Sequence, residues 1–217
     1  DVAGFTVSPI TANTNESGSS DNFTVVLDAQ PNSDVVIDIT NGDATEGTLS
    51  TTQITFTSAN WNIPQTITVA GVDDAIADGN ITYDVTASVN SGSSDASFGS
   101  LAAQTVAVTN ADNDSPGITV SAISNHTAET GTQATFTIVL NTQPTGDVTI
   151  PLSSNDLTEG TISVASVTFT SANWNIPQTI TVTGVNDALI DGDITFNILT
   201  AVATSTDNNY NNLASRS

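Results

Sequence analysis

The chain has 217 residues, which is enough for one large domain or for two domains of about 100 residues each. It has no cysteine, one basic residue and a formal net charge of −22, so a disulfide framework and a thiolate zinc site are excluded. Nucleic acid and anionic membrane surfaces are not expected partners, because both require basic patches. No apolar stretch approaches the roughly 18 residues of a membrane-spanning helix, so no membrane insertion is expected.

The acidity instead favours cations, because clustered carboxylates repel one another unless a metal or solvent separates them. Two interpretations compete. Halophilic adaptation would spread acidic residues over the whole surface, whereas metal sites would place them at fixed positions. Only 11% of the residues are charged, and the acidic ones cluster in turns, which favours metal sites.

From the N-terminus onward, the chain reads as short β-strands separated by turns of Asn, Asp, Gly, Ser and Pro. Alternating apolar residues or short apolar runs occupy Phe23–Leu27, Asp34–Thr40, Gln53–Ser58, Gln65–Val72, Asn80–Val89, Gln104–Asn110, Phe136–Leu140 and Asp147–Leu152. No segment has a sustained helical period. Roughly seven strands in each half predict an antiparallel sandwich of immunoglobulin-like size.

An internal repeat organises the whole sequence. The segment Thr55–Val69 reads TFTSANWNIPQTITV, and Thr168–Val182 is identical to it, so Trp61 and Trp174 lie 113 residues apart. A period of this length is too long for a solenoid unit and fits a domain repeated in tandem. We therefore predict an all-β chain of two tandem antiparallel β-sandwiches, residues 1–114 and residues 115–217.

The second repeat is predicted to lack its final strand. After Leu101 the first repeat continues through AAQTVAVTNADND, whereas only Ala-Ser-Arg-Ser follows the matching Leu213. Two explanations are open. The array is cut short at this point, or another chain supplies the missing strand by addition to an open sheet edge.

Catalysis has few candidate residues. The single histidine, His126, lies in a turn-like segment and has no counterpart in the first repeat, where Asn13 stands. Carboxylates recur in the turns of both copies, which is typical of a structural device and not of one active site. Trp61 and Trp174 are interpreted as packing residues, with carbohydrate stacking as the alternative. We expect the protein not to be an enzyme.

The carboxylates follow a pattern at strand ends. Asp73-Asp74, Asp78-Gly79-Asn80 and Asp112-Asn113-Asp114 flank strands in the first copy, and Asn186-Asp187 and Asp191-Gly192-Asp193 take the matching places in the second. Calcium takes six to eight oxygen ligands, and loops at one end of a sandwich bring such residues together. The alternative is that Asp and Asn are ordinary turn formers here.

These segments resemble a known kind of repeat. The TFTSANWNIPQTITV block, followed by GVDDAIADGN and closed by VTNADND, looks like the tandem repeats of very large bacterial secreted proteins and adhesins, which are similar in layout to Calx-beta domains. The resemblance covers almost the whole chain. It implies an immunoglobulin-like sandwich with Ca²⁺ at one end, near the junction between domains.

The resemblance also implies the metal ligands. In the first copy they are Glu16, Asp43, Asp73, Asp74, Asp78, Asp112 and Asp114. In the second copy they are Glu129, Asp156, Asn186, Asp187 and Asp191. That copy departs from the pattern twice, because Asn186 replaces an aspartate and the closing aspartate pair is missing. Its site is therefore expected to be weaker or empty.

Three functions follow, in order of preference. The first is a non-catalytic, calcium-stiffened spacer repeat of a large bacterial surface or secreted adhesin, located outside the cell and next to further repeats of the same chain. The second is a self-assembling fibre or surface-layer subunit, in which identical subunits complete one another by strand exchange. The third is a module that binds glycans or another cell-surface target through an exposed tryptophan or loop aspartates.

Overall fold

The computed structural model describes residues 1–186, 189–190 and 192–215, and in these residues every regular element is a β-strand. The described part contains no helix that is long and apolar enough to cross a membrane. The chain divides into two compact units. The first consists of Asp1–Asp74 and Asp78–Asn113, and the second of Ala75–Ala77 and Asp114–Ser217.

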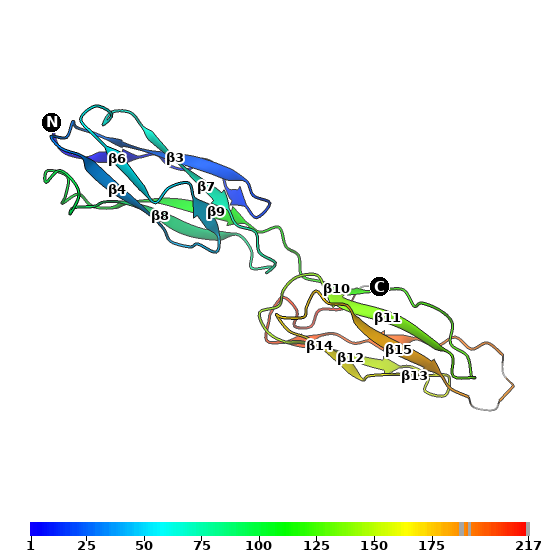
Figure 1. Cartoon of the computed structure of the whole chain (residues 1–217). Coiled ribbons are helices and arrows are strands. Elements are labelled where there is room, and N and C mark those ends of the chain that lie inside the picture. Colours follow the sequence, from blue (N-terminus) through cyan, green and yellow to red (C-terminus); the bar gives the residue numbers. More distant parts are fainter. Residues whose placement is uncertain (187–188, 191, 216–217) are drawn as a thin grey trace. The chain divides into compact units, whose positions relative to one another are not determined.

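The first unit is a sandwich of two sheets (Figure 1). One sheet has the strand order β1-β3-β7-β5, and the other has β2-β9-β8-β4-β6. All pairs are antiparallel except β2 with β9, which is parallel. The strands are β1 (Phe5–Val7), β2 (Thr14–Asn15), β3 (Ser20–Leu27), β4 (Val35–Asn41), β5 (Gly47–Leu49), β6 (Gln53–Phe56), β7 (Gln65–Gly71), β8 (Ile81–Val89) and β9 (Gln104–Ala111).

Alternation along each strand builds the core of the first unit. In β4 the side chains of Val35, Ile37 and Ile39 are buried, while the residues between them face outward. Successive side chains of a strand point to opposite faces of a sheet, so this pattern places one apolar face of each sheet against the other. Phe23, Phe56 and the inward residues of the other strands complete a single apolar cluster.

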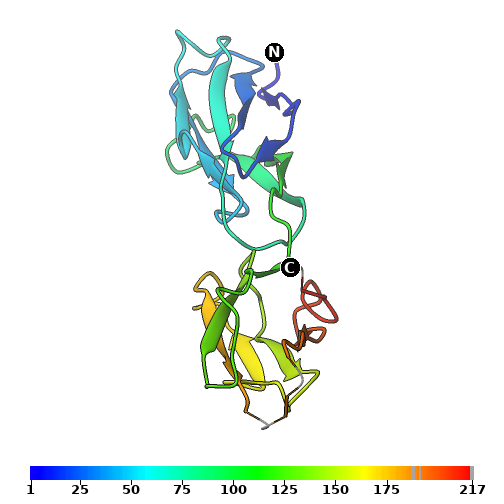
Figure 2. The ribbon, with the colours of Figure 1, turned by 90° about the vertical axis from the view of Figure 1, so that its right-hand side faces the viewer.

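The second unit repeats this arrangement with a shorter second sheet. One sheet has the order β10-β11-β15-β13, and the other has β14-β12-β16, with β17 also paired to β12. The final segment of the chain, red in Figure 2, is mostly irregular. The strands are β10 (Ile118–Val120), β11 (Gln133–Leu140), β12 (Val148–Ser154), β13 (Gly160–Ile162), β14 (Ser166–Phe169), β15 (Gln178–Gly184), β16 (Ile198–Thr200) and β17 (Thr204–Ser205).

The identical 15-residue block has the same structural role in both units. Its turn is closed by an asparagine side chain, because Asn60 Oδ1 accepts the Thr57 N–H and Asn173 Oδ1 accepts the Thr170 N–H, each at 2.6 Å. The carbonyl oxygen of each tryptophan accepts a backbone N–H of the neighbouring sheet strand at 3.1 Å. Both indoles are half-buried and pack against their cores, as the packing interpretation predicts.

The units differ where β8 and β9 stand in the first. β8 is nine residues long and lies between β4 and β9, whereas its counterpart β16 is three residues long and pairs only with β12. Among the described residues of the second unit, no strand pairs with the other edge of β16. The predicted fold class, all-β with two tandem antiparallel immunoglobulin-like sandwiches, is confirmed.

Candidate metal centre

Strand pairing brings four loops together at one end of the first sandwich. Asn110 of β9 is opposite both Thr14 of β2 and Ile81 of β8, and Gly47 of β5 is opposite Gly71 of β7. The loops that enter or leave these strands therefore meet at the same end. Each of them carries at least one acidic residue next to the strand end, as the sequence pattern predicts.

Four carboxylates gather in these loops. Oxygen atoms of Glu46, Asp74 and Asp78 lie within 4.8 Å of one another, and an oxygen of Glu16 lies within the same distance of Asp74. Asp74 and Asp78 are exposed, but the two glutamates are buried, with 4% exposure for Glu16 and 6% for Glu46. Burying an ionised carboxylate is costly unless it is paired or coordinates a metal.

The surroundings of Glu46 disfavour its ionised form. Burial raises the pKa of Glu46 above its ordinary value of 4.5, and the neighbouring carboxylates of Asp78, Asp43 and Asp74 raise it further. A hydrogen bond from Asn110 lowers the pKa; its effect is smaller than that of burial but larger than that of any one of these carboxylates. A divalent cation bound by these oxygens would replace their mutual repulsion with attraction.

A tyrosine hydroxyl points into the same corner. Tyr83 is 7% exposed, and its hydroxyl is buried without a hydrogen-bond partner. It lies against Gly47, the residue after Glu46, where an added Cβ would collide with it. Burial raises the pKa of Tyr83, and the charges of Glu46 and Asp43 raise it further. A buried hydroxyl that lacks a partner beside a buried glutamate is what a site completed by an ion or its water would contain.

Asn110 supports the centre from the last strand of the unit. Its Nδ2 donates to Glu46 Oε2 at 3.3 Å and to the Val72 carbonyl at 3.0 Å, and its Oδ1 accepts from Thr14 Oγ1 at 3.0 Å. The side chain of Asn110 is 1% exposed. Asn110 therefore fixes the position of the Glu46 side chain relative to the end of β7. It forms the side of the centre that β9 contributes.

The other acidic residues predicted for the first copy lie around this group. Asp43 is half-buried, and its Oδ1 accepts from the N–H and the hydroxyl of Thr45 at 3.0 and 2.5 Å, so the Thr45 hydroxyl lowers the pKa of Asp43. Asp73 is exposed and accepts from Asn113 at 3.4 Å. Asp112 accepts the Gly79 N–H at 2.7 Å. Asp114 is the first residue of the long segment that forms the second unit.

Three residues of the centre were not among the predicted ligands or their supports: Glu46, Tyr83 and Asn110. The ThrGluGlyThr turn that contains Glu46 recurs in the second copy, with Glu159 at the matching place. That recurrence is a usable signal. Tyr83 and Asn110 occupy inward positions of alternating strands, so their sequence pattern indicates core residues and nothing more.

The matching residues of the second unit do not form such a group. Glu129 and Asn186 are exposed, and Asp156 is half-buried with its Oδ1 engaged by the N–H and hydroxyl of Thr158 at 3.0 and 2.6 Å. The predicted ligands Asp187 and Asp191 lie outside the described residues. In the part of the second unit that is described, no three acidic side chains come within 4.8 Å of one another.

Comparisons with known proteins find similarity to solved structures only. No protein-family model matches the chain, and no curated protein matches it. Calcium binding domain CBD12 of CALX1.1 is 14% identical, with 99% of this chain and 83% of that chain covered and a TM-score of 0.37. CBD12 from CALX1.2 is 12% identical, with 92% and 79% covered and a TM-score of 0.37. The E. coli chaperone DraB is 8% identical, with 100% and 97% covered and a TM-score of 0.38.

Proposed function

We propose that this chain is a non-catalytic extracellular spacer repeat of a large bacterial surface or secreted adhesin, and that calcium bound in its first sandwich stiffens it. The observation that carries the proposal is the group of four carboxylates at one end of that sandwich, two of them buried. Oxygen ligands of this kind suit a hard cation, and a group of several carboxylates suits Ca²⁺ better than Mg²⁺, which keeps most of its waters.

The residues present fit such an ion. Glu46, Asp74 and Asp78 would hold it, with Glu16 next to Asp74 as a further ligand. The buried Tyr83 hydroxyl, which has no partner in the chain, would donate to a ligand or to a water of the ion. The bound ion would supply positive charge, which would counter the burial and the carboxylate repulsion that raise the pKa of Glu46.

Stiffening would follow from the connections of Glu16. The N–H of Asn113, the last residue of the first unit, donates to Glu16 Oε2 at 2.9 Å, and Asp112 is tied to Gly79 at 2.7 Å. An ion that fixes Glu16 and Asp74 would also restrict the segment that leaves the first sandwich. When ion binding orders this segment, fewer conformations remain open to the chain, and the chain becomes stiffer.

The proposal of a non-catalytic role is supported by the lack of suitable catalytic side chains among the described residues. His126, the single histidine, is exposed. The backbone N–H of this residue donates to the Asn125 side chain at 2.9 Å. The half-buried, core-packed indoles of Trp61 and Trp174 give no support to the glycan-binding alternative.

The proposal is tested by calorimetric titration of the whole chain with CaCl₂ after chelation, with MgCl₂ as the control. We expect calcium binding in the first sandwich and a higher melting temperature for that sandwich. In small-angle scattering we expect the chain to sample a narrower range of radii of gyration. Absence of both heat and a melting shift would refute the metal centre. Binding without a change in scattering would keep the metal centre and refute the stiffening.

A further inference from the structure

An asparagine followed directly by a glycine occurs once in the sequence, in the first unit. The two residues are Asn41, the last residue of β4, and Gly42, which is exposed. Glycine has no side chain that would hinder its backbone nitrogen, so this is the pair in which the backbone can most easily attack the preceding carboxamide. We refer to residues 41–47, which run from Asn41 through Glu46 to Gly47, as the Asn41 turn.

The geometry of the first unit favours glycine at position 42. A Cβ atom there would lie 2.5 Å from the carbonyl oxygen of Asp84, and the same oxygen accepts the Gly42 N–H at 2.9 Å. A larger residue would have to displace β4 from β8 at the end of their ladder, where Asn41 is opposite Val85. The close approach of these two strands is therefore linked to a chemically reactive pair of residues.

The closed turn engages the groups that the reaction needs. Asn41 Nδ2 donates to the Gly47 carbonyl at 2.5 Å, and Asn41 Oδ1 accepts the Asp43 N–H at 3.2 Å. The N–H of Gly42 is held by the carbonyl of Asp84. These three hydrogen bonds keep the Gly42 nitrogen away from the Asn41 carboxamide carbon, so the reaction requires the turn to open.

The Asn41 turn carries a buried carboxylate whose surroundings oppose closure. Glu46 is 6% exposed, and it has oxygen atoms of two further carboxylates within 4.8 Å. Gly47, whose carbonyl accepts from Asn41, lies against the Tyr83 hydroxyl, which has no hydrogen-bond partner among the described residues. Segments with such costly buried groups open locally at a lower free energy than the whole fold.

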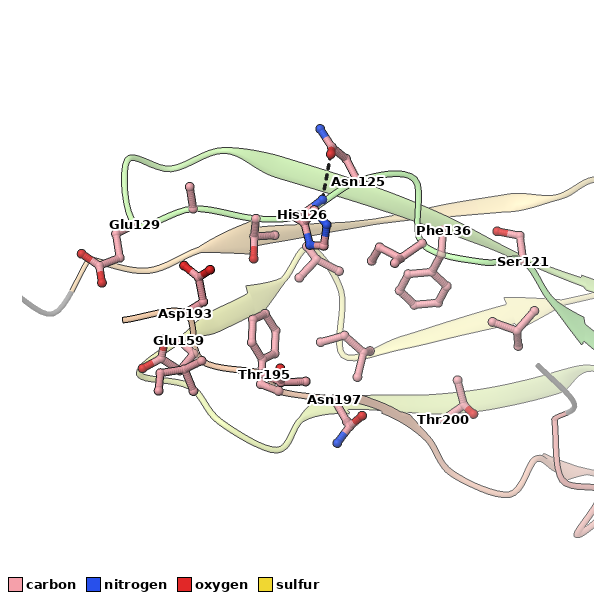
Figure 3. A pocket seen from close by; sticks show the side chains of 18 of the residues that line it. Ser121, Asn125, His126, Glu129, Phe136, Glu159, Asp193, Thr195, Asn197 and Thr200 are labelled. Atoms are coloured by element: carbon pink, nitrogen blue, oxygen red, sulfur yellow. Dashed lines mark hydrogen bonds between the residues drawn. The ribbon is translucent and has the colours of Figure 1, made fainter. Parts of the chain in front are cut away.

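The second unit provides an exposed asparagine that lacks a following glycine. Asn155 occupies the place of Gly42, and the side chain of the next residue, Asp156, hinders attack by the intervening nitrogen. The Asn155 N–H donates to the Asn197 carbonyl at 3.0 Å, as that of Gly42 does to Asp84, and Asn155 Oδ1 accepts the Asn197 N–H at 2.7 Å. Figure 3 shows Asn197 on the wall of an open groove. Asn155 therefore serves as the internal reference.

We propose that Asn41 is a modification site, at which the chain converts this asparagine to aspartate or isoaspartate when the Asn41 turn opens. The Gly42 nitrogen loses its proton to solvent and bonds to Asn41 Cγ, the Cγ–Nδ2 bond breaks, and ammonia leaves. Water then opens the imide ring. Breaking the bond from the Gly42 nitrogen to Cγ gives aspartate, and breaking its bond to the Asn41 main-chain carbonyl carbon gives isoaspartate.

The modification would prevent the turn from closing again. A carboxylate replaces the amide that donated to the Gly47 carbonyl, so two oxygen atoms face each other where a hydrogen bond was. The new charge also lies in the same turn as Asp43 and Glu46. The conversion itself does not depend on a metal, whereas its consequence for calcium binding depends on the proposed function.

The test incubates the whole chain at mildly alkaline pH in water labelled with heavy oxygen, which enters each newly formed carboxylate. Samples contain chelator, calcium, or chelator with urea, and peptide mapping by mass spectrometry follows each asparagine. In chelator we expect Asn41 to react at least about tenfold faster than Asn155, and at least about tenfold more slowly than in urea, because the opening equilibrium sets this ratio. Equal rates at Asn41 and Asn155, equal rates at Asn41 with and without urea, or no reaction at Asn41 in the folded chain would each overturn the proposal.

Two variants measure the effect of the product. Asn41→Asp reproduces the aspartate, and Asn41→Ser introduces the residue that the second unit has at this place, without a charge. In chelator the first sandwich of Asn41→Asp should melt at a lower temperature than that of Asn41→Ser, and the reverse order would overturn the disruptive effect of the product.

Calcium separates this inference from the proposed function. It should slow the modification of Asn41 in the folded chain at least about threefold, because a ligand of the closed form lowers the open population. A reactive Asn41 whose rate calcium does not change would keep the modification site and count against the calcium centre. An unreactive Asn41 in a chain that binds calcium would overturn the modification site alone.

Discussion

The two sandwiches share an identical block and the same strand register in their first sheets. Their equivalent glutamates nevertheless differ in burial. In the first, Glu16 and Glu46 are buried; in the second, Glu129 is exposed and Glu159 half-buried. Registers match pair for pair, as in Phe23↔Ile67 and Phe136↔Ile180. The difference therefore arises outside the shared sheet.

The last strand of the first sandwich explains most of this difference. β9 brings Asn110 against Glu46 and carries the segment whose Asn113 N–H contacts Glu16. Tyr83, on the neighbouring strand, is buried, whereas its counterpart Phe196 is half-buried and has no hydroxyl. One strand thus completes the apolar core and builds the acidic centre. No strand takes this place in the described part of the second unit, and the glutamates there are not buried.

The largest expected effect is on the cores. Phe56→Ala and Phe169→Ala make the same change in the identical block, at side chains that are both fully buried. Each should cost about 3–5 kcal/mol, as core phenylalanine truncations do. Because the second sandwich has the shorter sheet, we expect Phe169→Ala to abolish its calorimetric transition and Phe56→Ala to lower the other by more than about 10 °C. A single transition that responds equally to both variants would contradict this prediction.

The next largest effect distinguishes Glu46 from its counterpart Glu159 by their contribution to stabilisation by calcium. Glu46→Gln should remove the stabilisation of the first sandwich by calcium, which for a bound ligand amounts to about 2.7 kcal/mol at a hundredfold excess over Kd. Glu159→Gln is the matched control, because it changes the equivalent residue of the repeat in a unit whose described acidic side chains form no group of three within 4.8 Å. Thermal unfolding with and without calcium measures both. Equal losses in the two variants would show that the centre is not confined to the first sandwich.

A smaller effect tests whether the Tyr83 hydroxyl contributes to calcium binding. Tyr83→Phe should weaken calcium binding by about 1 kcal/mol, the usual contribution of one hydrogen bond. Without calcium the same variant should be neutral or slightly more stable, because it removes a buried hydroxyl that has no partner. Calorimetric titration and chelated melting curves measure the two effects. Destabilisation of the chelated protein would indicate that the hydroxyl has a structural partner and is not part of the metal centre.

The strands and the repeat were predictable because they depend on local signals. Period-two alternation identifies segments such as Phe23–Leu27, and it holds wherever one face of a strand is buried. Asp74 and Asp78 were also predictable as members of the centre, because acidic residues at strand ends share one edge of the sandwich.

The rest of the centre depends on long-range packing. Glu46 is buried because Asn110, 64 residues later, covers it, and Tyr83 reaches it because Gly47 has no side chain. The resemblance implies Asp43 as a further ligand, and in the structure the N–H and hydroxyl of Thr45 engage its Oδ1. Burial decides which acidic residues need a cation, and the sequence of one turn does not contain that information.

The smallest expected effect concerns pH in the absence of calcium. The pKa of Glu46 in the folded protein is raised, mainly by burial, so the folded state binds the additional proton. Its contribution to stability is therefore complete below the unfolded value near 4.5 and declines as the pH rises through the folded pKa. Asp95 behaves in the opposite sense, because the Ser97 N–H lowers its pKa below 3.8, so its contribution is lost only at more acidic pH.

As the pH rises above about 4.5, the chelated first sandwich should thus become less stable, and calcium should reverse the slope because it binds the ionised form. Urea unfolding at several pH values measures this dependence. Glu46→Gln is the control that should make the chelated profile shallower. The remaining slope then comes from Asp78, whose pKa is also raised mainly by burial, and the acid side stays with Asp95, Asp21 and Asp43, whose pKa values are lowered by hydrogen bonds. A chelated stability that rises over this range would mean that Glu46 is compensated within the chain and that the centre does not require a cation.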